Sequence, residues 1–231
     1  MKQLKNDTAT RVVQAAVQLF SHKGYSGTST RQIARLASVN EALVFHYFPT
    51  KQELFWASLR SCLERLRVRK ELQAGLAQNG EPEEVLPLIV ELLVQTATYH
   101  PELVRLFSVG LQELRPGTEV LYQEHLAPTV QAIGEYLKGC VQKDTVRGLD
   151  PEITLRAMVS TILCRPLYGE RMDESFANAE EAIAGYSQFW LNTLMPWRKP
   201  SASAKKPPLV FGMADTRSRA TILREKVNVE S

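Results

Sequence analysis

Hydrophobic residues recur at helical spacing through most of this 231-residue chain. The first segment, residues 6–23, carries an apolar stripe at the positions of an amphipathic helix: Val13, Ala16, Val17 and Phe20. Gly24 follows and is expected to end this helix in a left-handed conformation. The sequence has no internal repeat and no alternation long enough for a β-strand, so the pattern predicts an all-α protein.

Residues 29–48 predict two short helices joined by a tight turn. Small polar residues stand where a helix start needs a side chain that accepts from free backbone amides. Short helices with so small a turn between them cross steeply and expose the second helix, which is the geometry of a DNA-binding helix-turn-helix. The expected helix starts are marked by Ser29 with Gln32, by Asn40, and by Thr50 with Glu53.

The rest of the chain indicates further helices separated by proline and glycine. Asp150 before Pro151 combines a capping carboxylate with a proline at the first helical position, so a helix is expected to begin there. Pro128 is expected to kink the helix that contains it. Breaks at residues 79–82, 100–101 and 115–117 separate these helices, of which the longest are expected over about 51–78 and 118–143, and the last two over about 150–166 and 175–195.

These elements divide the chain into three parts. A helix-turn-helix head spans residues 6–66, a helical regulatory and dimerisation body spans residues 82–196, and a tail spans residues 197–231. The tail opens with a stretch rich in Pro, Ser and Lys that is typical of linkers, so it is expected to be basic and mobile.

Charge is distributed unevenly between these parts. Residues 1–81 hold 12 Lys and Arg against 6 Asp and Glu, a net charge of +6, whereas residues 82–196 hold 8 against 16, a net charge of −8. A basic head on an acidic body indicates that only the head meets a polyanion, although solvated helices also differ in charge by chance. One basic patch is interpreted as a solvated face in preference to a phosphate site: Arg65, Arg67, Arg69 and Lys70.

The order of residues in the head resembles the DNA-binding domain of the TetR family of bacterial regulators. The matching positions are Gly24-Tyr25, Thr28-Ser29, Ile33-Ala34, residues 37–40, residues 42–48 and Lys51. The resemblance covers roughly residues 6–55, and elsewhere it extends only to the helical layout. It implies a transcriptional regulator that binds a palindromic operator in double-stranded DNA as a homodimer. Repression is the family's commoner mode, and activation is the alternative.

The resemblance, together with side-chain chemistry, assigns two sets of DNA contacts. Phosphate contacts are expected from the first helix of the motif and from the ends of its neighbours, and base contacts from the exposed second helix. Glu41 suits a cytosine amino group, and Arg31 suits a phosphate or a guanine edge. The phosphate set is Thr28, Ser29, Thr30, Tyr47 and Lys51, the base-reading set is Asn40, Glu41, Ala42, Leu43, Phe45 and His46, and Arg31 is open to either set.

Some of these positions have structural alternatives. Asn40 alternatively serves only as a cap, and Phe45 alternatively packs at the groove wall. Tyr25 is expected to pack on the head in preference to reaching a phosphate. The residues assigned to the core of the head are Val39, Val44 and Phe48.

Three positions depart from the family pattern. Ser38 stands where the family has glycine, which costs about 1 kcal/mol if the backbone there is left-handed. Phe45 stands in place of tyrosine and lacks its hydroxyl, and Ala42 stands in place of glycine. These departures indicate that the protein binds an operator with a distinct sequence.

The resemblance also assigns two roles to the body. The last two helices are expected to pair two chains as a four-helix bundle, and a small-molecule effector is expected to bind within the body and release DNA. The effector is not identified by the sequence, and each candidate residue is alternatively an ordinary core or surface residue. The candidate pocket residues are Tyr99, His100, Phe107, Tyr122, His125 and Tyr168.

Enzyme classes have little support in the sequence. It has no Gly-rich phosphate loop and no HExxH motif, so we predict no catalytic residues, no metal site and no cofactor. Cys62, Cys140 and Cys164 are odd in number and far apart, which is typical of reduced thiols in the cytoplasm. No apolar run approaches the roughly 20 residues of a membrane span. We therefore expect a bacterial cytoplasmic protein at the nucleoid, with a helical protein-binding adaptor as the alternative.

Overall fold

The computed structural model describes residues 2–164, 167 and 178–195, with side chains from residue 7 onward. The chain falls into two units, Met1–Pro196 and Trp197–Ser231. The second unit, and with it the expected tail, lies outside the described residues. The described part holds eleven helices and no strand, which confirms the all-α prediction.

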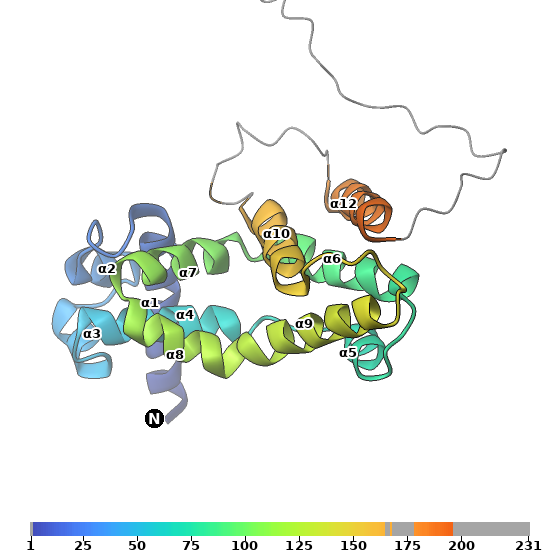
Figure 1. The fold of residues 1–231 in the computed structure, drawn as a ribbon. Coiled ribbons are helices and arrows are strands. Elements are labelled where there is room, and N and C mark those ends of the chain that lie inside the picture. Colours follow the sequence, from blue (N-terminus) through green and yellow to red (C-terminus); the bar gives the residue numbers. More distant parts are fainter. Residues whose placement is uncertain (1, 165–166, 168–177, 196–231) are drawn as a thin grey trace, which may run out of the picture. The chain divides into compact units, whose positions relative to one another are not determined.

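Four helices form the head (Figure 1): α1 (Lys2–Lys23), α2 (Thr30–Leu36), α3 (Glu41–Tyr47) and α4 (Lys51–Leu63). Seven more follow: α5 (Lys70–Ala77), α6 (Pro82–Tyr99), α7 (Pro101–Glu113), α8 (Arg115–His125), α9 (Ala127–Gln142), α10 (Pro151–Leu163) and α12 (Ala179–Leu194). Gly24 ends α1 with φ 75°, as the sequence predicts.

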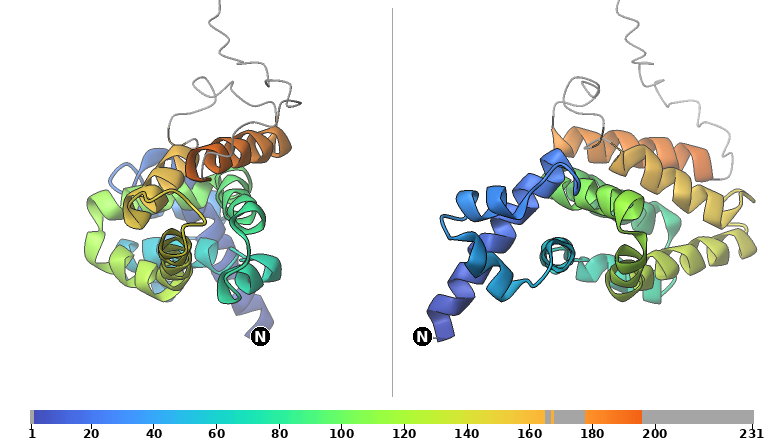
Figure 2. Two further views of the ribbon diagram at one scale, coloured as in Figure 1. Left: turned by 45° about the vertical axis from the view of Figure 1, so that its right-hand side comes forward. Right: turned by 90° about the vertical axis from the view of Figure 1, so that its left-hand side faces the viewer.

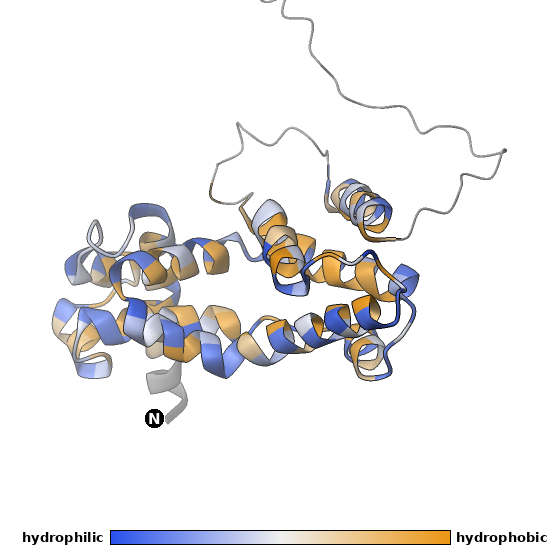
Figure 3. Cartoon of the chain, in the orientation of Figure 1, coloured by the Kyte–Doolittle hydropathy of each residue, from blue (hydrophilic) through white to orange (hydrophobic). Residues whose placement is uncertain are grey.

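Two apolar clusters hold these helices together, and most helices turn a hydrophobic side inward (Figure 3). The first cluster joins the head to α7 and α8, because Phe20 and Phe55 share it with Leu106 and Leu121. The second cluster contains residues of α5, α6, α9, α10 and α12, among them Met158 and Trp190. In this part α12 and α10 both pack on α6, as the two views of Figure 2 show.

The prediction of one long helix over residues 51–78 is wrong, because α4 ends at Leu63 and α5 begins only at Lys70. The intervening segment passes from one apolar cluster to the other. Leu66 packs against the first cluster and Val68 against the second. Burial of these two side chains in different cores therefore outweighs the helical propensity of the segment.

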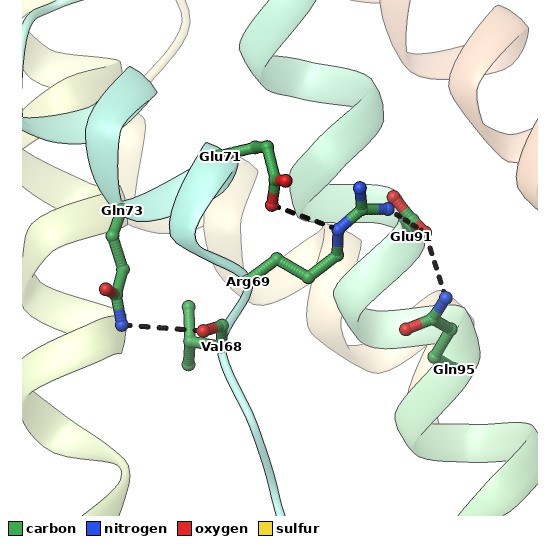
Figure 4. A network of polar contacts seen from close by, with 6 residues as sticks. All are labelled: Val68, Arg69, Glu71, Gln73, Glu91 and Gln95. Carbon is green, nitrogen blue, oxygen red and sulfur yellow. Dashed lines mark hydrogen bonds and ion pairs between the residues drawn. The ribbon is translucent and has the colours of Figure 1, made fainter.

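The arginines of the expected basic patch face partners within the protein. Arg65 pairs with Glu102 at 3.3 Å, and the Arg67 guanidinium donates to a backbone carbonyl. Figure 4 shows Arg69 between two carboxylates, at 2.6 Å from Glu91 and 3.3 Å from Glu71. The Arg65 and Arg69 side chains also remain about half exposed, which agrees with the interpretation of the patch as a solvated face.

The break expected at residues 115–117 is also displaced. Arg115 opens α8, and Pro116 occupies its first turn, where a proline without an N–H is tolerated. The chain breaks instead at Leu114 and again at Leu126, so the helix expected over 118–143 is two helices. Pro128 accordingly lies in the first turn of α9 and does not kink a longer helix.

Candidate nucleic-acid interface

Side-chain caps fix the starts of the two short helices at this surface. The Ser29 hydroxyl accepts from the Gln32 amide at 3.2 Å, and the Gln32 side chain accepts from the Ser29 amide at 2.9 Å. Asn40 Oδ1 accepts from the Leu43 amide at 2.7 Å. The capping box at Ser29 and the cap at Asn40 are therefore confirmed.

The turn between α2 and α3 has a left-handed backbone at Ser38, with φ 56°. The Ser38 amide donates to the Arg35 carbonyl at 3.2 Å, and the Val39 amide donates to the Ala34 carbonyl at 3.0 Å. The turn is therefore closed by bonds to the last turn of α2. A residue other than glycine in this conformation costs about 1 kcal/mol.

The two sides of α3 differ in burial. Val44 is 1% exposed, and Val39 and Phe48 pack against the first apolar cluster, which confirms their assignment to the core. On the other side Phe45 is 44% exposed. Ala42 and His46 are also exposed, whereas Glu41, Leu43 and Tyr47 are half-buried. The second helix of the motif is therefore anchored by one edge and open on the other.

The three neighbouring hydroxyls at the start of α2 have different surroundings. Thr28 is 2% exposed, and its hydroxyl donates to the Leu19 carbonyl at 3.2 Å or the Gly24 carbonyl at 2.8 Å. The Thr30 hydroxyl donates to Glu41 Oε1 at 2.6 Å. Ser29 is exposed, and within the described ranges its hydroxyl has no acceptor. Of the three, only Ser29 keeps its proton for an external acceptor.

The start of α4 presents a positive charge beside the motif. The Thr50 hydroxyl caps it by accepting from the Glu53 amide at 3.1 Å. Lys51 Nζ lies 4.2 Å from the centroid of the Tyr25 ring, close enough for a cation–π contact. Desolvation lowers the pKa of Lys51.

The Tyr25 ring itself packs on the head. Its centroid lies 5.8 Å from that of Phe20 and 5.7 Å from that of Phe55, which confirms the packing expected for Tyr25. The exposed turn after α1 and the start of α4 are therefore held on one aromatic cluster.

Glu113 contacts the turn after α1, which the sequence did not predict. From the end of α7 its carboxylate accepts from the Tyr25 amide at 3.2 Å, the Ser26 amide at 3.0 Å and the Ser26 hydroxyl. The hydroxyl bond, more than the others, holds the pKa of Glu113 below its ordinary value, and Lys51 adds to this. The partners are 87 and 88 residues apart, so no local pattern could have indicated them.

The six residues predicted for an effector pocket do not gather at one described site. Phe107 and Tyr122, with ring centroids 6.2 Å apart, line a groove of about 870 Å³ between α7 and α8. Tyr99 is 64% exposed, and His125 lies 3.9 Å from Glu124. His100 is half-buried at the junction of α6 and α7, and Tyr168 lies outside the described residues.

The described part of the chain holds neither a metal-ion site nor a membrane-spanning helix. There, no three His, Cys, Asp or Glu side chains converge as they would around a metal ion. None of the helices in the described ranges has the length and apolar character needed to cross a membrane. The three cysteines are free thiols, with Cys62 and Cys140 buried.

A capped, exposed second helix on a small helical unit defines a protein of the helix-turn-helix class. The family model described as bacterial regulatory proteins, tetR family, matches residues 12–57, which include the whole motif. The chain is 31% identical over 164 residues to the transcriptional repressor SCO4008 of Streptomyces coelicolor, covering 69% of this chain and 80% of that protein. The chain therefore belongs to the TetR family.

Two further comparisons extend this result. The chain is 32% identical over 126 residues to the transcriptional regulator BetI of Agrobacterium fabrum, covering 52% of this chain but only 60% of BetI. The fold matches a crystal structure of AibR in complex with isovaleryl coenzyme A and operator DNA. The TM-score is 0.64 at 17% identity, with 79% of this chain and 97% of that one covered.

Proposed function

We propose that this protein is a DNA-binding transcriptional regulator that inserts α3 into the major groove of its operator. The observation that carries the proposal is the contrast between the buried Val44 and the exposed Ala42, Phe45 and His46 on the same helix. A helix anchored in this way presents a constant set of side chains to base edges. The match of residues 12–57 to the family model supports the same assignment.

The proposed contacts divide into two sets. Ser29, Arg31, Tyr47 and Lys51 position the head on phosphates, and Thr28 is left out because its hydroxyl donates within the protein. Phe45 has no hydrogen-bonding group, so it favours a thymine methyl or the groove wall. The proposed base-reading set on and before α3 is Asn40, Glu41, Ala42, Leu43, Phe45 and His46.

Two such heads are needed to read a palindrome, so the functional unit is a homodimer. Large apolar side chains stand exposed on the helices proposed to pair: Ile153 of α10 is 68% exposed and Phe189 of α12 is 56% exposed. Burial of these side chains against a second copy would hold two heads in one molecule, and reading two half-sites one turn of DNA apart requires a spacing of about 34 Å between them. Sedimentation at micromolar concentration tests this, and a stable monomer would contradict it.

The proposed mode of regulation is repression relieved by a small-molecule effector in the body. Repressor names among the relatives, such as that of SCO4008, support repression over activation. The groove lined by Phe107 and Tyr122 lies along α7. The last residue of that helix, Glu113, contacts the head. An effector acts only if it binds the DNA-competent and DNA-incompetent arrangements with different affinity. The protein acts in the bacterial cytoplasm, at the nucleoid.

Selection of bound duplexes from a random pool, followed by a salt titration, tests the proposal. A two-fold symmetric site and an affinity that falls steeply with salt are expected, because phosphate contacts release counterions. Lys51→Ala should weaken binding to all sequences and reduce the salt slope by about 1, whereas Glu41→Ala should relax preference at one position. Absence of any preference at low ionic strength would overturn the proposal and favour a protein-binding adaptor.

A further inference from the structure

The first residues of the two motif helices are joined by a hydrogen bond. Thr30 begins α2, Glu41 begins α3, and the Thr30 hydroxyl donates to Glu41 Oε1 at 2.6 Å across eleven positions of the chain. That distance is typical of a hydroxyl that donates to an ionised carboxylate, the stronger class of hydrogen bond. Both side chains are half-buried, so the bond is partly shielded from solvent.

This bond changes the role available to Thr30. A hydroxyl has one proton to donate, and a phosphate oxygen without a proton can only accept. While Thr30 donates to Glu41, it cannot also donate to a phosphate. The hydroxyl is therefore committed to a neighbouring side chain in place of the DNA backbone.

The same bond leaves Glu41 with one free acceptor. Among the described residues, the second carboxylate oxygen has no hydrogen-bond partner. An ionised carboxylate only accepts, so it suits the amino group of cytosine in the major groove. Thymine presents O4 and guanine presents O6 and N7 at the corresponding edge, and these acceptors repel a carboxylate.

We propose that Thr30 is a positioning residue that holds Glu41 in the orientation that reads cytosine. This inference rests on the proposed function, because it assigns base contact to Glu41 and the positioning of Glu41 to Thr30 within the proposed DNA-binding surface. A glutamate side chain with free rotamers loses conformational freedom when it binds a base. The bond from Thr30 restricts it beforehand, and a restricted carboxylate also cannot turn away from an unfavourable base.

The alternative is that the bond only joins α2 to α3. In that case its loss would lower stability and weaken binding to every sequence equally. Base preference at a single position separates the two roles, because a general loosening of the motif does not select one base pair.

Four variants of the full chain form the experiment: Thr30→Val, which keeps the branched shape without the hydroxyl, Thr30→Ser, which keeps the hydroxyl, Glu41→Ala, and the double variant Thr30→Val with Glu41→Ala. Random-pool selection on the wild type and on Glu41→Ala first locates the position that Glu41 reads. Binding is then measured to duplexes that carry cytosine or thymine there, and thermal melting verifies that each variant is folded.

Glu41→Ala should reduce the preference for cytosine by about tenfold. Thr30→Val should reduce it by about threefold at the same position only, and Thr30→Ser should stay within about twofold of wild type. The double variant should show no further loss beyond Glu41→Ala, because the two residues act through one contact.

An unchanged cytosine preference in Thr30→Val, an equal loss on both duplexes, or additive losses in the double variant would each overturn the inference and leave the proposed function standing. A Glu41→Ala variant with unaltered preference would do the same. A wild type without preference among duplexes would instead contradict the proposed function itself.

Discussion

Three helices of the head and four helices of the body begin in different ways. In the head, α2, α3 and α4 begin at polar side chains that accept from a backbone amide of the new helix, namely Ser29, Asn40 and Thr50. In the body, α6 to α9 each have a proline in the first turn and no side-chain cap, whereas α10 and α12 are capped by Asp150 and Asn178. A cap fixes the first turn by a directed bond, whereas proline restricts the chain without a bond.

This difference follows the uses proposed for the two regions. The starts of α2, α3 and α4 surround the surface proposed to meet DNA, where a shift of a single turn would misplace every contact. Local bonds set each of them independently of the rest of the protein. No such bond sets the first turn of α6 to α9, so the starts of these four helices depend on packing and on their prolines.

The largest effect is expected where the two regions meet, at Gly110 of α7. A Cβ there would lie 2.4 Å from Thr118 Oγ1 and 3.3 Å from the Phe55 ring, and Thr118 and Phe55 are fully buried. Gly110→Ala should therefore lower the free energy of unfolding by about 2–3 kcal/mol, although alanine favours helices. Denaturant titration measures the change.

The matched control for this substitution is Gly134→Ala in α9. Its Cβ would meet only the Leu155 side chain, at 3.9 Å, which is an ordinary contact. It should stabilise the protein by about 0.5–1 kcal/mol through helix propensity alone. Equal effects of the two substitutions would mean that α7 and α8 do not pack tightly on the head.

The next effect tests the two kinds of helix start directly. Asn40→Ala removes the bond from the Leu43 amide and should cost about 1 kcal/mol. Pro101→Ala at the start of α7 should cost only about 0.5 kcal/mol, because it acts mainly through the entropy of the unfolded chain. Thermal melting of both variants compares them, and a larger loss for Pro101→Ala would reverse the contrast drawn between the regions.

A smaller effect, of opposite sign, is expected at Ser38. Its left-handed backbone favours glycine, so Ser38→Gly should stabilise the protein by about 0.5–1 kcal/mol. Gly24→Ala, at φ 75° after α1, should destabilise it by a similar amount, about 1 kcal/mol. Chemical denaturation of the pair checks both signs, and a destabilised Ser38→Gly variant would contradict the strain assigned to this turn.

The smallest effect concerns pH and the contact between Glu113 and the head. The pKa of Glu113 is lowered in the folded protein, chiefly by the Ser26 hydroxyl, so its contribution is present above the unfolded pKa. The contribution is lost as the pH falls through the lowered folded pKa. Glu113→Gln should therefore be less stable than wild type at about pH 7, with the gap closing below about pH 4.

Melting curves across that pH range measure this difference. Glu102→Gln is a suitable control, because Glu102 also lies on α7 but pairs with Arg65 outside the turn after α1. A gap for Glu113→Gln that widened on acidification would show that the carboxylate is not stabilised in its charged form.

The features that the sequence predicted correctly are those fixed by near neighbours. Ser29 and Asn40 cap helices within three residues, and Asp150 Oδ1 accepts from the Ile153 amide at 2.9 Å, so the local pattern was sufficient. The helix break at residues 64–69 was missed because it depends on which of two cores buries Leu66 and Val68.

The candidate interface divides in the same manner. Which face of α3 is open follows from the spacing of Val44 and its neighbours and was predicted. The sequence did not predict that the Thr28 and Thr30 hydroxyls donate to groups within the protein, because these acceptors depend on how α1, α2 and α3 cross. The contact of Glu113 with the turn after α1 could not be predicted from any local pattern, because it forms only when α7 packs on the head.

The apolar cluster shared by the head, α7 and α8 bears on attempts to exchange DNA-binding modules between regulators. Leu106 is fully buried and Leu121 is 2% exposed in the same cluster as Phe20 and Phe55. A chimaera joined near residue 66 would graft a new head onto foreign helices and leave this core mismatched. A transplant from this protein should therefore carry residues 101–126 along with the head, even though residues 67–100 separate the two pieces in the chain.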